Sequence, residues 1–260
     1  MDVKMRNLTV ALASALLLAG GNVATPTFAA GKPKPAAAPA IDPAALQAAS
    51  RMGAYLRSLE SFEVTSSASL EEVIDAKGTK TTTQVTGAYK VRRPDGFVID
   101  ITTAKKARRF IYDGKSFTVF APKVGYFATV SAPPTIDQTV ETIYDAYGVI
   151  LPLADLFYWG TDSQPTDQVT SAKRLGLEKV GGVEADHYAF AGPGLSWEVW
   201  IQRGDTPLPR RMRIITIDDP AKPTFTANLT WTTPAAFAPD TFTFKPATDA
   251  KPIAMAGVDP

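Results

Sequence analysis

Apolar and polar residues alternate over about a dozen short stretches of this chain, and this period of two constrains the fold more than any other feature. Phe62, Val64, Ala68, Leu70 and Ile74 fall on even numbers, and Val85, Tyr89 and Val91 repeat the alternation on odd numbers. Such alternation predicts β-strands with one apolar face. Turn signals at Lys77-Gly78 and Asp113-Gly114 separate the stretches, which is typical of an antiparallel meander.

The alternation forms two groups of strands with a helical insert between them. The first group is predicted at 62–74, 85–91, 97–101, 110–112, 117–119 and 126–130. The second group is predicted at 175–180, 185–190, 197–201, 212–217, 225–231 and 242–244.

Two amphipathic helices accompany the strands. In the first helix Asp42 suits the N-cap and Pro43 suits the first helical position. The apolar residues of this helix recur every three or four positions. The second is predicted from Thr135 to Tyr147, with Gly148 ending it. We therefore expect a mainly β fold with α: a strongly curved antiparallel sheet, an unclosed β-barrel or half-barrel, covered by the N-terminal helix and the central insert.

The N-terminal 29 residues have the layout of a secretory signal peptide, with Lys4 and Arg6 before an apolar run and small residues before a cleavage site at Ala29. The apolar run is too short for a membrane anchor. We expect residues 30–41 to form a flexible linker, 42–248 a single domain and 249–260 a flexible tail. No later segment is apolar enough for a transmembrane helix, so the mature protein is expected to be soluble and periplasmic.

Composition excludes several kinds of chemistry. The chain has 260 residues, no cysteine and one histidine, His187. Disulfides, a thiol nucleophile and lipidation at a cysteine are therefore impossible. Removing Asp2, Lys4 and Arg6 with the leader takes the net charge from +1 to zero, which does not favour nucleic acid as a partner. We predict no catalytic residues, no metal site and no cofactor, and hence a protein that is not an enzyme.

The apolar face of the predicted sheet is the strongest candidate for a binding site. Rigid apolar walls suit an acyl chain, because such a cavity binds mainly by excluding water. The alternative is that these residues pack a solid core against the helices. The candidates are Phe62, Val64, Tyr89, Val91, Phe97, Ile99, Phe110, Tyr112, Phe117, Val119 and Trp197.

The central insert and one basic turn supply two further sets of candidates. The insert, residues 136–159, is predicted to act as a lid through Ile136, Val140, Ile143, Leu153, Leu156 and Phe157. Four cations lie in one turn at Lys105, Lys106, Arg108 and Arg109. They suit anionic headgroups at the rim of the cavity or at a membrane surface. The alternative is a solvated turn that protects a sheet edge, with Asp100 and Asp113 to balance its charge.

Several segments together resemble one known superfamily. Residues 196–201 (SWEVWI), followed by Pro207-Leu208-Pro209-Arg210, resemble a hairpin of the LolA/LolB-like periplasmic lipoprotein carriers, and 240–246 (DTFTFKP) resembles their last strand. The segments 92–95 (RRPD), 109–114 (RFIYDG) and 147–156 (YGVILPLADL) resemble a branch of predicted periplasmic proteins of unknown function. The resemblance implies a half-barrel with a helical lid and an apolar cavity. The chain departs from the carriers in its larger central insert.

These observations favour a periplasmic binding or carrier protein for a lipid, an acyl chain or another elongated apolar ligand. The alternative is an envelope sensor or assembly module that binds another protein through an exposed patch around Trp159 or Trp200. A hydrolase has little support, because the chain has no G-x-S-x-G motif to accompany His187. Alternation also places Asp186 and His187 on opposite faces of one strand.

Overall fold

The computed structural model describes residues 41–154 and 168–258. Two helices occur in these ranges, α1 (Pro43–Ser58) and α2 (Ile136–Tyr147). The first group of strands is β1 (Ser61–Val73), β2 (Lys80–Arg92), β3 (Gly96–Thr103), β4 (Ala107–Tyr112), β5 (Ser116–Ala121) and β6 (Tyr126–Ser131). The second group is β7 (Ser171–Val180), β8 (Val183–Gly192), β9 (Leu195–Gln202), β10 (Pro209–Thr216), β11 (Thr224–Thr232) and β12 (Lys251–Pro252).

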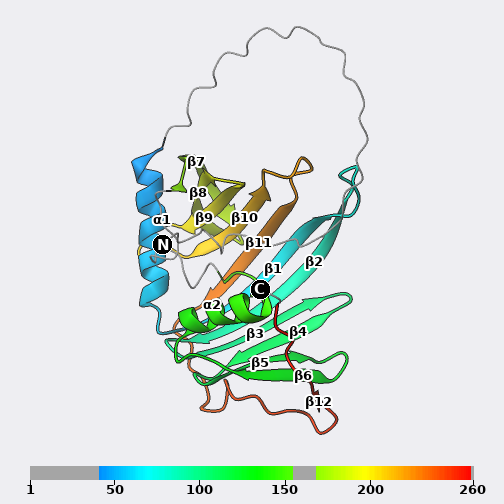
Figure 1. Ribbon diagram of the computed structural model, residues 1–260. Helices are drawn as coiled ribbons and strands as arrows, with labels where there is room; N and C mark the ends of the chain where they lie inside the picture. The colour runs from blue at the N-terminus through cyan, green and yellow to red at the C-terminus, as the bar shows by residue number, and fades with distance from the viewer. Residues whose placement is uncertain (1–40, 155–167, 259–260) are drawn as a thin grey trace, which may run out of the picture.

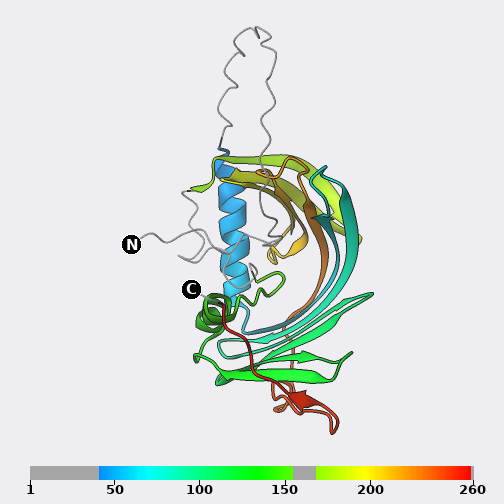
Figure 2. The same cartoon turned by 45° about the vertical axis from the view of Figure 1, so that its right-hand side comes forward.

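The described strands form one open sheet in the order β12-β6-β5-β4-β3-β2-β1-β11-β10-β9-β8-β7. Strands β1 to β11 pair antiparallel with one another, β12 pairs in parallel with β6, and β1 joins the two groups by pairing with both β2 and β11. The sheet bends into a deep trough whose two edges do not meet, with both helices on the concave side (Figures 1 and 2). The prediction of a mainly β, strongly curved and unclosed sheet with two helices is confirmed.

Helix α1 crosses the open side of the trough (Figure 2). The Asp42 carboxylate accepts a hydrogen bond from the Ala44 amide at 2.9 Å, which caps the first turn. The Asp42 amide donates to the Ala172 carbonyl of β7, and the Arg93 amide donates to the Glu60 carbonyl just past the helix. Both ends of α1 are thus attached to the sheet, while its apolar stripe faces the concave side.

The core lies between the concave face and the helices. On β1 the buried positions are Phe62, Val64, Ser66 and Ala68, which is the period of two that the sequence predicted. Helix α1 adds Met52 and Leu56, each at most 1% exposed. Burial of large apolar side chains from both layers is the main stabilising term for such a fold.

Helix α2 is fixed to the first group of strands by its N-terminal end. The Thr135 hydroxyl caps the helix, and Gly148 ends it in the left-handed conformation at φ 63°. The Tyr112 hydroxyl donates to the Pro133 carbonyl at 2.5 Å, and the Thr139 hydroxyl donates to the same oxygen at 3.1 Å. Neither helix of the described part of the chain is long and apolar enough to cross a membrane.

Residues 237–244 pack on the outer face of the sheet, whereas residues 251–258 run past β6 to α2, and here one sequence-based prediction needs correction. Residues 242–244 are not a strand: Phe242 packs against Val98 and Ile111, which point outward from β3 and β4. The segment 249–258, predicted to be a flexible tail, contains the two-residue strand β12, which pairs in parallel with β6; its flexibility stays a prediction. Alternation was misleading because this stretch uses its apolar side chains to cover a second, smaller apolar surface.

Several predictions lie outside the described residues. They concern the signal peptide at 1–29, the linker as far as residue 40, and the lid residues Leu156 and Phe157. The proposed partner contact at Trp159 also lies outside the described residues.

Candidate ligand-binding cavity

A partly enclosed cavity of about 810 Å³ lies on the concave side of the sheet, beneath α2 and the segment that follows it. This volume falls within the range of about 300–1,000 Å³ that is usual for small-molecule sites. Its walls come from β1, β2, β3, β10, β11, α2 and residues 149–154. The cavity therefore joins both groups of strands to the central insert.

The floor of the cavity is the same apolar face that forms the core, continued toward the other end of the strands. Leu70 continues the inward-facing series of β1, Val85 that of β2 and Ile101 that of β3. Ile214 and Phe225 contribute from β10 and β11. Because residues two apart on a strand share a face, one continuous apolar surface runs from packed core to open cavity.

Side-chain size explains why one end is filled and the other is hollow. At the filled end the inward positions carry large rings, among them Phe62, Phe97 and Tyr112, each at most 2% exposed. At the hollow end the same face carries Thr83 and Thr103, with Val85 and Ile101 next to them. These smaller side chains leave room that the facing helix does not fill.

Gly87, Ser66 and Tyr89 make a very close contact within the packed core. A Cβ on Gly87 would lie 2.5 Å from the Ser66 hydroxyl oxygen and 2.7 Å from Cε2 of Tyr89, so the ring covers the glycine. The Tyr89 hydroxyl is hydrogen-bonded to Ser66, and burial raises the pKa of Tyr89 above its ordinary value. The ring thus occupies the space that a side chain at position 87 would need.

The segment 149–154 covers the cavity from the side opposite the sheet. Leu151 and Leu153 are 3% and 6% exposed and both line the cavity. Leu153 has φ 58°, a left-handed conformation that costs a non-glycine residue about 1–2 kcal/mol. Strain of this kind persists only where the surrounding structure compensates for it, and it concentrates at binding sites.

The cavity is apolar within and polar at its edge. Threonines 81, 82, 83 and 103 lie along it with Glu72, and the turn between β3 and β4 adds Lys105 and Lys106. The Glu72 carboxylate accepts a hydrogen bond from the Thr83 hydroxyl at 3.4 Å. An apolar interior beside hydroxyls and ammonium groups suits a molecule with an apolar body and a polar end.

The eleven predicted wall residues do not line this cavity. Nine of them are buried in the core, while Val119 and Trp197 are partly buried and pack against it. The nine are Phe62, Val64, Tyr89, Val91, Phe97, Ile99, Phe110, Tyr112 and Phe117. The alternation identified the correct face of the sheet, but the cavity occupies other residues of that face; a role of these eleven in ligand contact stays a prediction.

Some of the predicted lid and basic residues line the cavity, and others do not. Val140 and Leu153 line the cavity, whereas Ile136 and Ile143 are buried in the core. Lys105 and Lys106 lie at its edge.

The two arginines of the basic set lie on opposite sides of β4. Arg109 forms two hydrogen bonds with Asp100, at 2.7 and 3.0 Å, and this pairing raises the pKa of Arg109. Arg108 lies opposite Ile101 in the sheet and is exposed. Asp100 therefore balances only one of the four cations.

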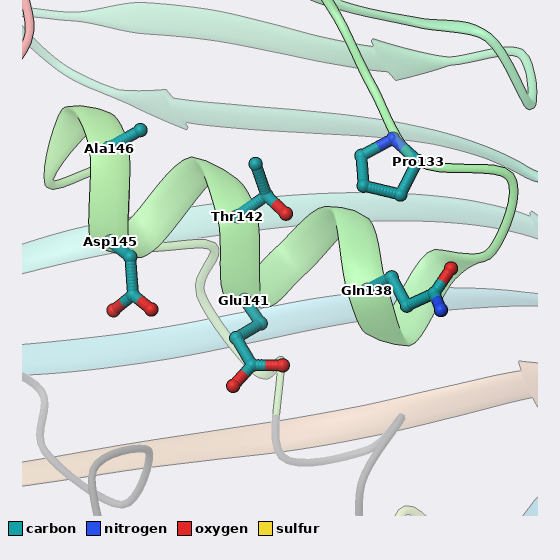
Figure 3. A pocket seen from close by; sticks show the side chains of 6 residues that line it. All are labelled: Pro133, Gln138, Glu141, Thr142, Asp145 and Ala146. Atoms are coloured by element: carbon teal, nitrogen blue, oxygen red, sulfur yellow. The ribbon is translucent and has the colours of Figure 1, made fainter.

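A second depression, of about 650 Å³, lies on the outer surface of α2 and is wide open to solvent. Glu141 and Asp145 point to the same side of the helix there, one turn apart (Figure 3). Both are exposed, as are Gln138, Thr142 and Ala146. This surface has the character of a solvated helix face, because it offers no enclosed apolar wall.

His187 lies on the outer face of the sheet, away from the cavity. Its Nδ1 is 2.9 Å from Glu178 and its Nε2 is 3.0 Å from Glu198, and the ring stacks on Trp200 at 3.8 Å. With a carboxylate at each ring nitrogen, this arrangement differs from a Ser-His-Asp triad. Trp200 is only 5% exposed, so it provides no exposed patch for a protein partner.

An open, strongly curved sheet with two helices on its concave side and an apolar cavity beneath α2 defines the class of half-barrel proteins with an internal site. Within that class the chain belongs to the family described as predicted periplasmic protein (DUF2092), whose model matches residues 45–256. This confirms the resemblance to a branch of predicted periplasmic proteins. The comparison with curated proteins found no match to this chain.

Solved structures similar to this chain include LprF from Mycobacterium bovis, at 14% identity and a TM-score of 0.45, covering 77% of this chain and 97% of LprF. The lipoprotein LppX from Mycobacterium tuberculosis is similar at 12% identity and a TM-score of 0.39, covering 75% and 98%. A LolA superfamily protein from Nitrosomonas europaea is similar at 10% identity and a TM-score of 0.34, covering 77% and 97%.

Proposed function

We propose that this protein binds an elongated apolar or amphiphilic ligand, such as a lipid or an acyl chain, and carries it in the periplasm. The cavity of about 810 Å³, with aliphatic and aromatic walls and a polar edge, is the observation that supports this function. Burial of apolar surface contributes roughly 25 cal/mol per Å², so a long chain enclosed by such walls gains most of its affinity from leaving water. The function is binding rather than catalysis.

In this proposal α2 and residues 149–154 act as the cover, and the sheet acts as the floor. Val140 of α2 and Leu153 reach the cavity from one side, while Val85 and Ile101 face it from the other. A ligand between them touches apolar side chains on both sides. The threonines, Glu72 and the two lysines at the edge then meet its polar end.

The test is binding of a fluorescent long-chain fatty acid, followed by emission and by displacement with unlabelled fatty acid. The variant Ile101→Trp places a large ring in the cavity and is expected to weaken binding at least 10-fold, because it occupies ligand volume. The matched control is Thr102→Trp, since Thr102 is the neighbouring residue and is exposed on the outer face.

Saturable binding that Ile101→Trp weakens and Thr102→Trp preserves supports the proposal. Absence of saturable binding by the folded protein, or equal affinity in the two variants, contradicts it. Circular dichroism of all three proteins checks that the variants retain the β structure.

A further inference from the structure

Two adjacent hairpin turns at the edge of the cavity form a basic surface with an exposed aliphatic tip. We define this basic rim as Lys105, Lys106 and Arg108 of the β3–β4 hairpin with Lys123 and Val124 of the β5–β6 turn. All five residues are exposed, and Val124 is 62% exposed. The basic rim combines cationic side chains with an apolar residue in contact with water.

The two turns are held together by one side chain. The Lys123 ammonium donates to the Thr103 carbonyl at 3.3 Å and to the Ala104 carbonyl at 3.0 Å. The β5–β6 turn is therefore fixed beside the β3–β4 turn, and both lie at the same end of the sheet (Figure 1). The basic rim is a defined surface rather than a set of separate side chains.

Few acidic residues accompany the basic rim, although Glu72 lies at the same cavity edge as Lys105 and Lys106. Between residues 101 and 126 the sequence contains a single acidic residue, Asp113. Asp113 lies at the opposite end of β4, where its carboxylate accepts hydrogen bonds from the backbone amides of Lys115 and Ser116. Asp100 pairs with Arg109 on the outer face.

We propose that the basic rim docks onto the surface of an anionic lipid bilayer. Lysine and arginine side chains near such a surface are attracted to its lipid phosphates, and an aliphatic residue that enters the headgroup layer adds a second, apolar contribution. The mature chain has no net charge, so this attraction belongs to the basic rim and not to the protein as a whole.

This inference goes beyond the proposed function, because it concerns an outer surface and not the interior. Lys105 and Lys106 belong to the basic rim and also to the edge of the cavity. A docked protein therefore brings the edge of its cavity to the bilayer, which gives an apolar ligand a short path between membrane and protein. Docking does not require the cavity to be occupied.

The test is sedimentation of the full mature protein with vesicles at low ionic strength. We expect the protein to sediment with vesicles of phosphatidylcholine and phosphatidylglycerol but not with phosphatidylcholine alone. Binding should weaken as salt is raised, because screening reduces the attraction. The double variant Lys105→Gln, Lys106→Gln is expected to bind about 10- to 30-fold more weakly, since each lysine contributes roughly 5-fold.

The matched control is Lys173→Gln, Lys179→Gln, which removes the same charge from exposed positions on β7, at the other edge of the sheet. A second variant, Val124→Ser, is expected to weaken binding with all charges intact. Docking is contradicted if the folded protein does not sediment with anionic vesicles, or if the two double variants bind them with equal affinity. Fatty-acid binding is measured without vesicles, so failure of the proposed function is seen separately.

Discussion

At the scale of single residues, Gly87 makes a very close contact within the packed core. The Tyr89 ring folds over it, and the Ser66 hydroxyl approaches the same point from β1. No side chain larger than hydrogen fits between them without displacing buried groups. A side chain at position 87 would therefore disturb both neighbours.

The variant Gly87→Ala is expected to lower the free energy of unfolding by about 1–3 kcal/mol, because its Cβ overpacks the Tyr89 ring and the Ser66 hydroxyl. Urea denaturation measures the change. Ala88→Ser, on the exposed outer face of the same strand, serves as the control and should stay within about 0.5 kcal/mol of the parent. Equal stability of the two variants contradicts the tight contact at Gly87.

A second residue-scale cluster surrounds His187 on the outer face. The Trp200 indole donates to Glu178 at 2.9 Å, and this bond, with His187, holds the pKa of Glu178 below its ordinary value of 4.5. A carboxylate with a lowered pKa stabilises the folded state above its unfolded pKa. That contribution is lost as the pH falls through the folded value.

The pH dependence of stability should therefore change in Glu178→Gln. Below pH 4.5 the parent protein is expected to lose stability more steeply than the variant, because only the parent has this carboxylate to protonate. Chemical denaturation monitored by tryptophan emission at several pH values measures both curves. Parallel curves for the two proteins between neutral pH and pH 3 argue against a contribution from Glu178.

At the scale of elements, α1 holds the open trough in shape. Its N-terminal end is bonded to β7 and its C-terminal end to the turn between β2 and β3, so the helix links the two halves of the sheet. Leu56 lies in the last turn of α1, on the apolar side of the helix, and is 1% exposed. Loss of this packing should therefore affect the whole domain.

Leu56→Ala is expected to destabilise the protein by about 2–5 kcal/mol, from lost burial and the cavity that remains. Gln47→Ala, on the exposed side of the same helix, should change the stability by no more than about 0.5 kcal/mol. Thermal unfolding followed by circular dichroism compares the two variants. A Leu56→Ala protein as stable as the Gln47→Ala protein speaks against this role of α1.

The elements themselves were largely predictable, because alternation, caps and turn residues act locally. The period of two located β1 to β11, and Asp42 and Thr135 indicated where the helices begin. Residues 242–244 were assigned wrongly, since an alternating pattern also arises where side chains cover an outer apolar surface.

The position of the cavity was not predicted, although the sequence contained a signal for it. Along the inward face of β2 and β3 the residues change from Tyr89 and Phe97 to Thr83 and Thr103. Hydrophobic pattern identifies the face, whereas side-chain size decides which part of that face is filled. The covering segment and the left-handed Leu153 depend on tertiary packing, which no local pattern reveals.

At the scale of the whole molecule, the concave and outer faces of the sheet have different roles. Its concave face holds the core and the cavity, its outer face is partly covered by the C-terminal segment through Phe242, and β12 extends one edge by pairing with β6. The second group of strands carries the His187 cluster on its outer face. Stability therefore comes from the filled end and the outer clusters, which leaves the hollow end available for a ligand.

Ligand binding should stabilise the whole domain. A molecule that binds only the folded protein adds about 2.7 kcal/mol when its free concentration is 100 times its dissociation constant. Differential scanning fluorimetry with increasing fatty acid should thus show a rising unfolding temperature in the parent and in Thr102→Trp. In Ile101→Trp the same titration should show little change, and an equal rise there contradicts binding in the cavity.

The most direct test of the central claim is mass spectrometry of apolar molecules extracted from the protein after purification from the periplasm. We predict that the parent protein releases a lipid or another long apolar molecule in near-stoichiometric amount, and that Ile101→Trp releases at least 10-fold less. An extract of the folded parent with no such molecule, or the same amount from the folded Ile101→Trp protein, would contradict the account.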